Sequence, residues 1–171
     1  MTRKPRNRFK LAQLSVTIAF LLASAGVTYF ISRYILAAKQ VAQCNRLNEI
    51  LNEGHAKVLA FQAKDEISTH QLASELEGIT LKLGGAELSD PNLRHYRGNF
   101  VRVYRELSQD FRKLGEALTL AHEADVTQTG QQQVKQAVSN VRQVGISVTQ
   151  TAENADRLAG DVNRYCAPRA E

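Results

Sequence analysis

Residues 134–165 read VKQAVSNVRQVGISVTQTAENADRLAGDVNRY, a run whose apolar positions recur every seven residues. One set of positions is Val134, Val141, Val148, Ala155 and Val162, and a second set follows it by three residues: Ala137, Val144, Thr151, Leu158 and Tyr165. These are the a and d positions of successive heptads, which are typical of helices that pack as in a coiled coil. The sequence therefore predicts one long C-terminal helix with a packed seam.

A second long helix is predicted upstream of this one. Asp90 is a favoured N-cap residue, and Pro91 is a favoured first residue of a helix. Apolar side chains then follow at spacings of three and four, which define one buried face: Leu93, Tyr96, Phe100, Val103, Tyr104, Leu107, Phe111, Leu114, Leu118 and Ala121. The connection near residues 125–130 is short, so the two helices are expected to be antiparallel neighbours.

Two more helices are predicted between residues 37 and 83. The first carries Leu47, Ile50, Leu51, Val58 and Phe61, and the second carries Leu72, Leu76, Ile79 and Leu83 before Gly84-Gly85. The break between them is expected either near Gly54-His55 or near residues 65–69. We prefer the second position, because Ser68 and Gln71 have capping-box spacing.

The two cysteines, Cys44 and Cys166, test this arrangement. Outside the cytoplasm, two cysteines without a CxxC motif most often form one structural disulfide. Four antiparallel helices bring both cysteines to one pole, whereas three would put them at opposite poles. We therefore expect an all-α, antiparallel, up-down-up-down four-helix bundle closed by a disulfide. Two buried free thiols remain an alternative, and a metal site is disfavoured because no zinc-ligand spacing is present.

The N-terminal residues predict a membrane anchor. Residues 1–10 form a basic leader that carries the whole excess charge of +5, so the rest of the chain is electroneutral and nucleic-acid binding loses its main support. Residues 11–32 are uncharged and would span about 33 Å as a helix, close to the thickness of a bilayer. The predicted anchor is 11–33, with the leader in the cytoplasm and the 34–171 domain outside it.

Two further expectations concern this anchor. A cleaved signal peptide, cut after Ala25, is the alternative to an uncleaved anchor, and both export the domain. Small residues at helical spacing could also let the anchor pack closely against another membrane helix: Ser15, Ala19, Ala23 and Gly26.

Three short runs resemble a known group of proteins. They are residues 41–46 (VAQCNR), 93–104 (LRHYRGNFVRVY) and 162–166 (VNRYC). Together they resemble an uncharacterised group of cyanobacterial membrane-anchored or lipid-anchored helical proteins with a cysteine near each end of an exported domain. The resemblance implies the disulfide and a plasma or thylakoid membrane location, with the domain on the periplasmic or lumenal side. It implies no activity.

No catalytic motif is present in the sequence: there is no HExxH, GxSxG, P-loop or GxGxxG. We therefore expect a protein that is not an enzyme and that needs no cofactor or metal. One helix carries a cationic stripe of Arg94, Arg105 and Arg112, which suits an acidic partner or anionic lipid headgroups. The expected function is that of an interaction, scaffold or accessory subunit whose partner is another membrane protein or a second copy. The alternative is a sensor-like four-helix module that binds a small molecule.

Overall fold

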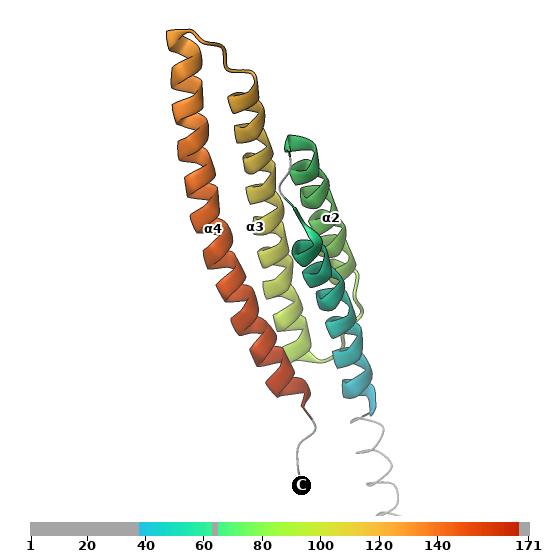
Figure 1. Cartoon of the computed structure of the whole chain (residues 1–171). Coiled ribbons are helices and arrows are strands. Elements are labelled where there is room, and N and C mark those ends of the chain that lie inside the picture. Colours follow the sequence, from blue (N-terminus) through green and yellow to red (C-terminus); the bar gives the residue numbers. More distant parts are fainter. Residues whose placement is uncertain (1–37, 63–64, 168–171) are drawn as a thin grey trace, which may run out of the picture. The chain divides into compact units, whose positions relative to one another are not determined.

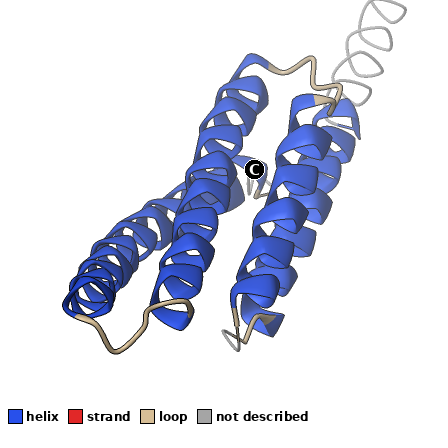
Figure 2. Cartoon of the chain, turned by 90° about the horizontal axis from the view of Figure 1, so that it is seen from above, coloured by secondary structure: helices blue, strands red, loops and turns tan. Residues whose placement is uncertain are grey.

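Four helices make up the part of the chain that the structure, a computed structural model, describes, namely residues 38–62 and 65–167 (Figure 1). They cover residues 38–60, Glu66–Gly84 (α2), Pro91–His122 (α3) and Gln128–Cys166 (α4), and these described ranges contain no strand. Consecutive helices are joined at alternate ends (Figure 2), so the predicted antiparallel four-helix bundle is confirmed for these residues. The chain divides into two units after Val41, so the bundle from Ala42 onward belongs to the second unit.

The break before α2 lies at the preferred position, but a different residue forms the cap. Asp65 is the N-cap: its carboxylate accepts the Ser68 backbone N–H at 2.8 Å, and the Ser68 hydroxyl oxygen accepts the Asp65 N–H at 3.3 Å. The capping box therefore starts three residues before the spacing of Ser68 and Gln71 indicated. At the other end, Gly85 caps the helix by donating its N–H to the Leu81 carbonyl.

The ends of α3 and α4 follow the same local chemistry. Asp90 caps α3 by accepting the backbone N–H groups of Asn92 and Leu93, and Pro91 occupies the first turn, as predicted. Thr127 caps α4 by accepting the Gly130 N–H at 3.2 Å. These caps satisfy N–H groups that have no partner inside the helix, and each stabilises its helix by about 1 kcal/mol.

The core draws on all four helices. The side chains with the least exposure include Leu47 from the 38–60 helix, Leu76 from α2, Val103 from α3 and Val162 from α4. The predicted aromatic residues of α3 belong to it: Phe100, Tyr104 and Phe111 are buried, and Tyr96 packs against its edge. Ala73 and Ser108 are small residues that let α2 and α3 approach closely. At this contact the Ser108 hydroxyl donates to the Ala73 carbonyl at 2.9 Å.

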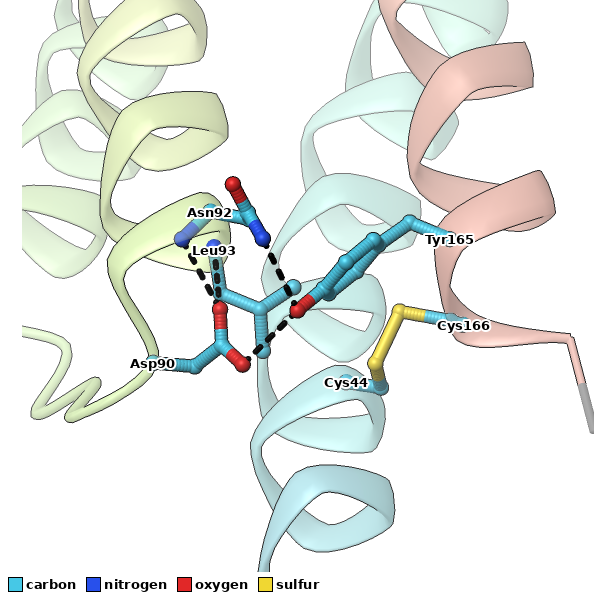
Figure 3. Close-up of a disulfide and its surroundings, with 6 residues drawn as sticks. All are labelled: Cys44, Asp90, Asn92, Leu93, Tyr165 and Cys166. Atoms are coloured by element: carbon cyan, nitrogen blue, oxygen red, sulfur yellow. Dashed lines mark hydrogen bonds between the residues drawn. A yellow bond between two sulfur atoms is a disulfide. The ribbon is translucent and has the colours of Figure 1, made fainter.

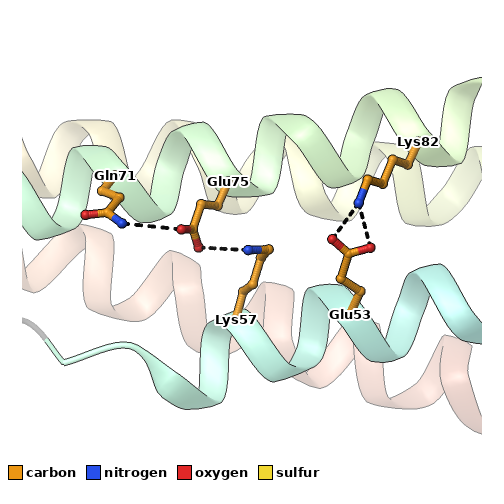
Figure 4. A network of polar contacts seen from close by, with 5 residues as sticks. All are labelled: Glu53, Lys57, Gln71, Glu75 and Lys82. Carbon is orange, nitrogen blue, oxygen red and sulfur yellow. Dashed lines mark hydrogen bonds and ion pairs between the residues drawn. The ribbon is translucent and has the colours of Figure 1, made fainter.

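Ion pairs join the solvent sides of the 38–60 helix and α2 (Figure 4). Lys82 Nζ lies 2.6 Å from Glu53 Oε1, and Lys57 Nζ lies 3.3 Å from Glu75 Oε2. Exposed pairs of this kind are worth about 0–1 kcal/mol each. They align the two helices, but the apolar core carries the stability.

The helices differ in length, and this difference shapes one pole of the bundle. At the pole away from the disulfide, α3 and α4 extend past the ends of the 38–60 helix and α2 (Figure 1). Phe61, just after the 38–60 helix, stacks edge-on against Phe111 with ring centroids 5.1 Å apart. The neighbouring Asp110 contacts Ser147 of α4. The 38–60 helix therefore ends level with Ser147, and the part of α4 that precedes Ser147 continues without it.

The predicted anchor at 11–33 lies outside the described residues, as do Ser15, Ala19, Ala23 and Gly26. Within 38–62 and 65–167, no helix combines the length and the apolar character that crossing a membrane requires.

Candidate functional site

The disulfide pole joins three helices and the loop between α2 and α3 (Figure 3). Cys44 and Cys166 are bonded to each other, which confirms the predicted pairing, and their Cα atoms lie 5.9 Å apart. Beside them, the Tyr165 hydroxyl donates to Asp90 Oδ2 at 2.8 Å and accepts from the Asn92 side chain at 3.2 Å. The end of α4 is thereby tied to the N-terminus of α3.

The 38–60 helix holds the same loop from the other side. Gln43 Oε1 accepts the backbone N–H groups of Ser89 and Asp90, at 2.6 Å and 3.0 Å. Arg97 of α3 also donates to the Ala86 carbonyl at 2.8 Å. This pole is a structural cluster, because its polar groups are hydrogen-bonded to one another.

Asp90 is the ionisable group at the centre of this cluster. Burial by itself raises the pKa of its carboxyl, but the Leu93 N–H, the Tyr165 hydroxyl, the Asn92 N–H and the charge of Arg94 outweigh burial and lower it below the usual 3.8. The carboxylate therefore stays ionised at neutral pH, where it caps α3 and accepts a hydrogen bond from the Tyr165 hydroxyl.

The predicted cationic stripe lies along the side of α3 next to α2. Arg94, Arg105 and Arg112 fall close to one line on the helix, since their spacings of 11 and 7 residues are close to whole turns. Arg112 is ion-paired with Glu77 of α2 at 2.7 Å, and Arg94 lies near Asp90. Arg105 is exposed and forms no ion pair within the described residues. Arg94 and Arg105 are therefore the exposed charges of the three, and Arg112 is half-buried.

A groove of about 520 Å³ opens between α3 and α4 on another side of the bundle. Its floor holds Asp110, whose residue surface is only 5% exposed. The Ser147 hydroxyl donates to Asp110 Oδ2 at 2.6 Å, and Lys113 Nζ lies 3.6 Å from Oδ1. Asn140 and Gln143 add amide groups to the rim. The arrangement offers a carboxylate, a hydroxyl and amides to a small polar ligand.

Sequence reasoning did not single out Asp110. A signal was available, because Asp110 follows Leu107 by three residues and precedes Leu114 by four, so it lies on the predicted buried face of α3. A carboxylate at such a position must find a donor across the helix interface. Ser147 carries no comparable signal, since it lies between the a and d positions of α4.

The seam of α4 differs from the prediction in its first half. The d positions Ala137, Val144, Thr151 and Leu158 are buried, as predicted. Among the a positions, Val148 and Ala155 pack against the core, but Val134 and Val141 are 41% and 37% exposed. The prediction was wrong for these two valines because α3 covers only the d side of α4, and the 38–60 helix ends before it reaches them.

Val138 extends this exposed strip, with 59% of its surface accessible. It lies on the same side of α4 as Val134 and Val141, at spacings of four and three. Gly145 follows one turn later, and a Cβ placed there would meet nothing within 4 Å. We call Val134, Val138, Val141 and Gly145 the α4 strip. Contiguous exposed apolar side chains mark interaction surfaces more often than isolated ones do.

Comparison with protein-family models, with curated proteins and with solved structures gives no match to this chain. Within the described residues, no cluster of three or more His, Cys, Asp or Glu side chains is placed to hold a metal ion.

Proposed function

We propose that this chain is a non-enzymatic, membrane-anchored helical interaction protein that acts outside the cytoplasm. The anchor is residues 11–33, the leader 1–10 faces the cytoplasm, and the bundle projects on the periplasmic or lumenal side of a bacterial plasma or thylakoid membrane. Its role is to hold an assembly together as a scaffold or accessory subunit.

The single observation that carries the interaction role is the α4 strip. Its valines are apolar side chains at helical spacing on a face that no part of the described bundle covers. Full burial of an exposed valine is worth about 1.5–3 kcal/mol, and because these side chains are 37–59% exposed, covering them would gain roughly half of that for each. A partner that covers the strip recovers this free energy.

The disulfide supports the proposed compartment. Disulfides persist in oxidising compartments and are rare in the cytoplasm of ordinary bacteria. Cys44 also follows the predicted anchor by only 11 residues in the sequence. An exported domain held near a membrane fits both features.

Purification of the tagged full chain from native membranes in a mild detergent tests the proposal. Mass spectrometry and a sizing step then report its companions. We expect the chain in the membrane fraction, with Cys44 and Cys166 resistant to alkylation before reduction, and with a stoichiometric companion or a second copy. A chain found in the soluble cytoplasmic fraction, or one that is monomeric and without a companion, would contradict the proposal.

Charge reversal at Arg105 tests whether the cationic stripe takes part. Arg105→Glu changes an exposed charge without breaking the Arg112–Glu77 pair, so the bundle is expected to keep its stability. Loss of an acidic companion in this variant would locate the docking face. Arg102→Glu is the matched control, since Arg102 is exposed on a different line of the same helix and is expected to retain the companion.

A second candidate function is that of a sensor-like module that binds a small molecule, and the α3–α4 groove favours it. The Asp110 carboxylate on its floor could accept hydrogen bonds from an amine or a hydroxyl of the ligand. A thermal-shift screen of small amines and polyols would test this role. A ligand that raises the melting temperature of the native chain but not of Asp110→Asn would support it, and the absence of any stabilising ligand would count against it.

A further inference from the structure

The carboxylate on the floor of the α3–α4 groove has one oxygen that the bundle leaves available. The Ser147 hydroxyl donates to Asp110 Oδ2 at 2.6 Å, and this bond joins α3 to α4. Among the described residues, no donor is hydrogen-bonded to the other oxygen, Oδ1. An ionised carboxylate has about four acceptor positions on its two oxygens. Asp110 therefore keeps acceptor capacity on the side that lines the groove.

The tie between the two helices does not account for the charge of Asp110. A hydroxyl donor such as Ser147 needs only one acceptor oxygen, which a neutral asparagine in place of Asp110 would also supply. A buried charge is costly unless a cation or several donors compensate it, and Asp110 is only 5% exposed. No cation of α4 pairs with this carboxylate within the described part of the chain. The charge is compensated from α3 alone, on the side of Oδ1.

Lys113 shows which chemical group Oδ1 accommodates. Its Nζ lies 3.6 Å from Oδ1, so an ammonium group already stands beside the carboxylate. That distance is longer than the roughly 2.7–3.2 Å of a hydrogen bond. The Lys113 side chain is 62% exposed and has a flexible four-carbon stem, so it can turn out to solvent with little loss. A ligand ammonium can then take its place at hydrogen-bond distance.

The charges that line the groove favour a cation over an anion. They are Asp110, Glu116 and Lys113, and the two carboxylates remain when Lys113 turns away. A concave site lined by one sign of charge attracts ligands of the opposite sign and repels those of the same sign. An ammonium compensates the buried carboxylate, whereas a second carboxylate brought into the groove would add to the negative charge.

The rest of the groove suits an apolar body attached to that ammonium. Ala117, Leu120 and Val144 line it between α3 and α4. Leu120 follows Asp110 by ten residues on α3, which is about 15 Å at helical rise, so the groove extends well beyond the carboxylate. A ligand that fills it has a charged end at Asp110 and an apolar end toward the junction of α3 and α4.

We propose that the α3–α4 groove binds a primary amine with an apolar body, whose ammonium donates to Asp110 Oδ1 in place of Lys113. This inference rests on the second candidate function and deepens it by naming the class of ligand. Lys113 is then a competitor built into the chain, since its own ammonium must leave before the ligand binds.

A series of three compounds with the same phenylethyl body tests the class of ligand on the native full chain. The probes are 2-phenylethylamine, 2-phenylethanol and 3-phenylpropanoate, titrated by calorimetry in mild detergent, with titrations into detergent alone as the blank. Because a charge-assisted hydrogen bond is stronger than a neutral one, the amine should bind at least about tenfold more tightly than the alcohol. The carboxylate should not bind.

Two substitutions test the residues that the proposal assigns. Asp110→Asn keeps an acceptor for Ser147 but removes the charge, so the affinity for the amine should fall by about ten- to a hundredfold. Lys113→Met keeps an apolar stem and removes the competing ammonium, so the affinity should rise by about two- to fivefold. Lys135→Met is the matched control, because Lys135 is exposed and does not line the groove, and it should bind the amine as the native chain does.

The outcomes separate this inference from the other proposals. Equal binding of the amine and the alcohol, no binding of the amine at millimolar concentration, or unchanged affinity in a folded Asp110→Asn would each overturn it. An affinity that falls in Lys113→Met would also overturn it, and this readout holds even if Asp110→Asn does not fold. Tight binding of the carboxylate or of a polyol instead would retain the sensor-like function and reject the amine. The interaction role fails separately, when the chain has no companion although the groove binds the amine.

Discussion

The ring of Tyr104 packs directly against Gly54 and fills the space that a side chain at position 54 would occupy. The Tyr104 hydroxyl passes over Gly54 and donates to the Leu51 carbonyl at 3.2 Å. This bond uses a carbonyl of the 38–60 helix and fixes the ring between that helix and α3. Glycine is needed at position 54 because the ring occupies the space of a Cβ.

Gly54→Ala should destabilise the bundle by about 1–3 kcal/mol, because its Cβ would lie 2.6 Å from Tyr104 Cζ and the buried ring has little room to move. Gly78→Ala is the matched control in α2. Its Cβ would meet nothing within 4 Å, so it should stabilise the helix by up to about 1 kcal/mol. Urea unfolding of both variants measures the difference, and equal stabilities would refute this account of Gly54.

Tyr104 also makes the free energy of unfolding depend on pH in the alkaline range. Burial raises the pKa of Tyr104 from 10.0 to about 12. The unfolded chain therefore loses this proton at lower pH than the folded chain, so the stabilisation is complete below pH 10 and is lost as the pH rises toward 12.

Tyr104→Phe should cost about 1 kcal/mol at neutral pH, the usual net value of one hydrogen bond. Because phenylalanine does not ionise, the stability of the variant should fall less steeply than that of the native protein above pH 10. Unfolding free energies measured between pH 7 and 11 should show the two proteins converging. Parallel curves would mean that the hydroxyl is not protected in the folded state.

At the scale of the element, Asp90 determines where α3 begins. Asp90→Ala removes the N-cap and should cost about 1 kcal/mol or somewhat more, since the Tyr165 hydroxyl also loses its acceptor. Asp90→Asn should cost less because asparagine is also a good N-cap.

The two variants also separate capping from charge. The pKa of Asp90 is lowered in the folded protein, so its carboxylate contributes stability at neutral pH that is lost as the pH falls below 3.8 and through the folded value. Native stability should therefore fall more steeply in acid than that of Asp90→Asn. Chemical denaturation at pH 7 and at pH 3 makes the comparison, and identical acid dependence would exclude a role for the charge.

Helix ends were predictable from the sequence because local residues determine them. Asp90-Pro91 and Gly84-Gly85 mark the ends of α3 and α2 through their own backbone chemistry, and the d positions of α4 follow from periodicity alone. The exposure of Val134 and Val141 was not predictable in this way. It depends on where a helix some 80 residues earlier in the chain ends, and periodicity within α4 carries no information about that neighbour. The contact between Asp110 and Ser147 depends in the same way on the register between two helices.

At the scale of the whole molecule, the disulfide and the α4 strip lie at opposite ends of the bundle and have different roles. From Cys166 to Val138 there are 28 residues of continuous helix, about 42 Å. The disulfide closes the pole where the 38–60 helix meets α4. The strip lies where that helix is missing, so removal of the covalent link should leave the strip unchanged.

The separation gives a prediction for the double variant Cys44→Ser, Cys166→Ser. The cysteines are 122 residues apart in sequence, and the chain-entropy model assigns a bond that closes a loop of this size about 4–5 kcal/mol. Urea unfolding of the native chain and of the double variant should show most of that loss. A loss below about 1 kcal/mol would mean that the unfolded chain gains little freedom without the bond.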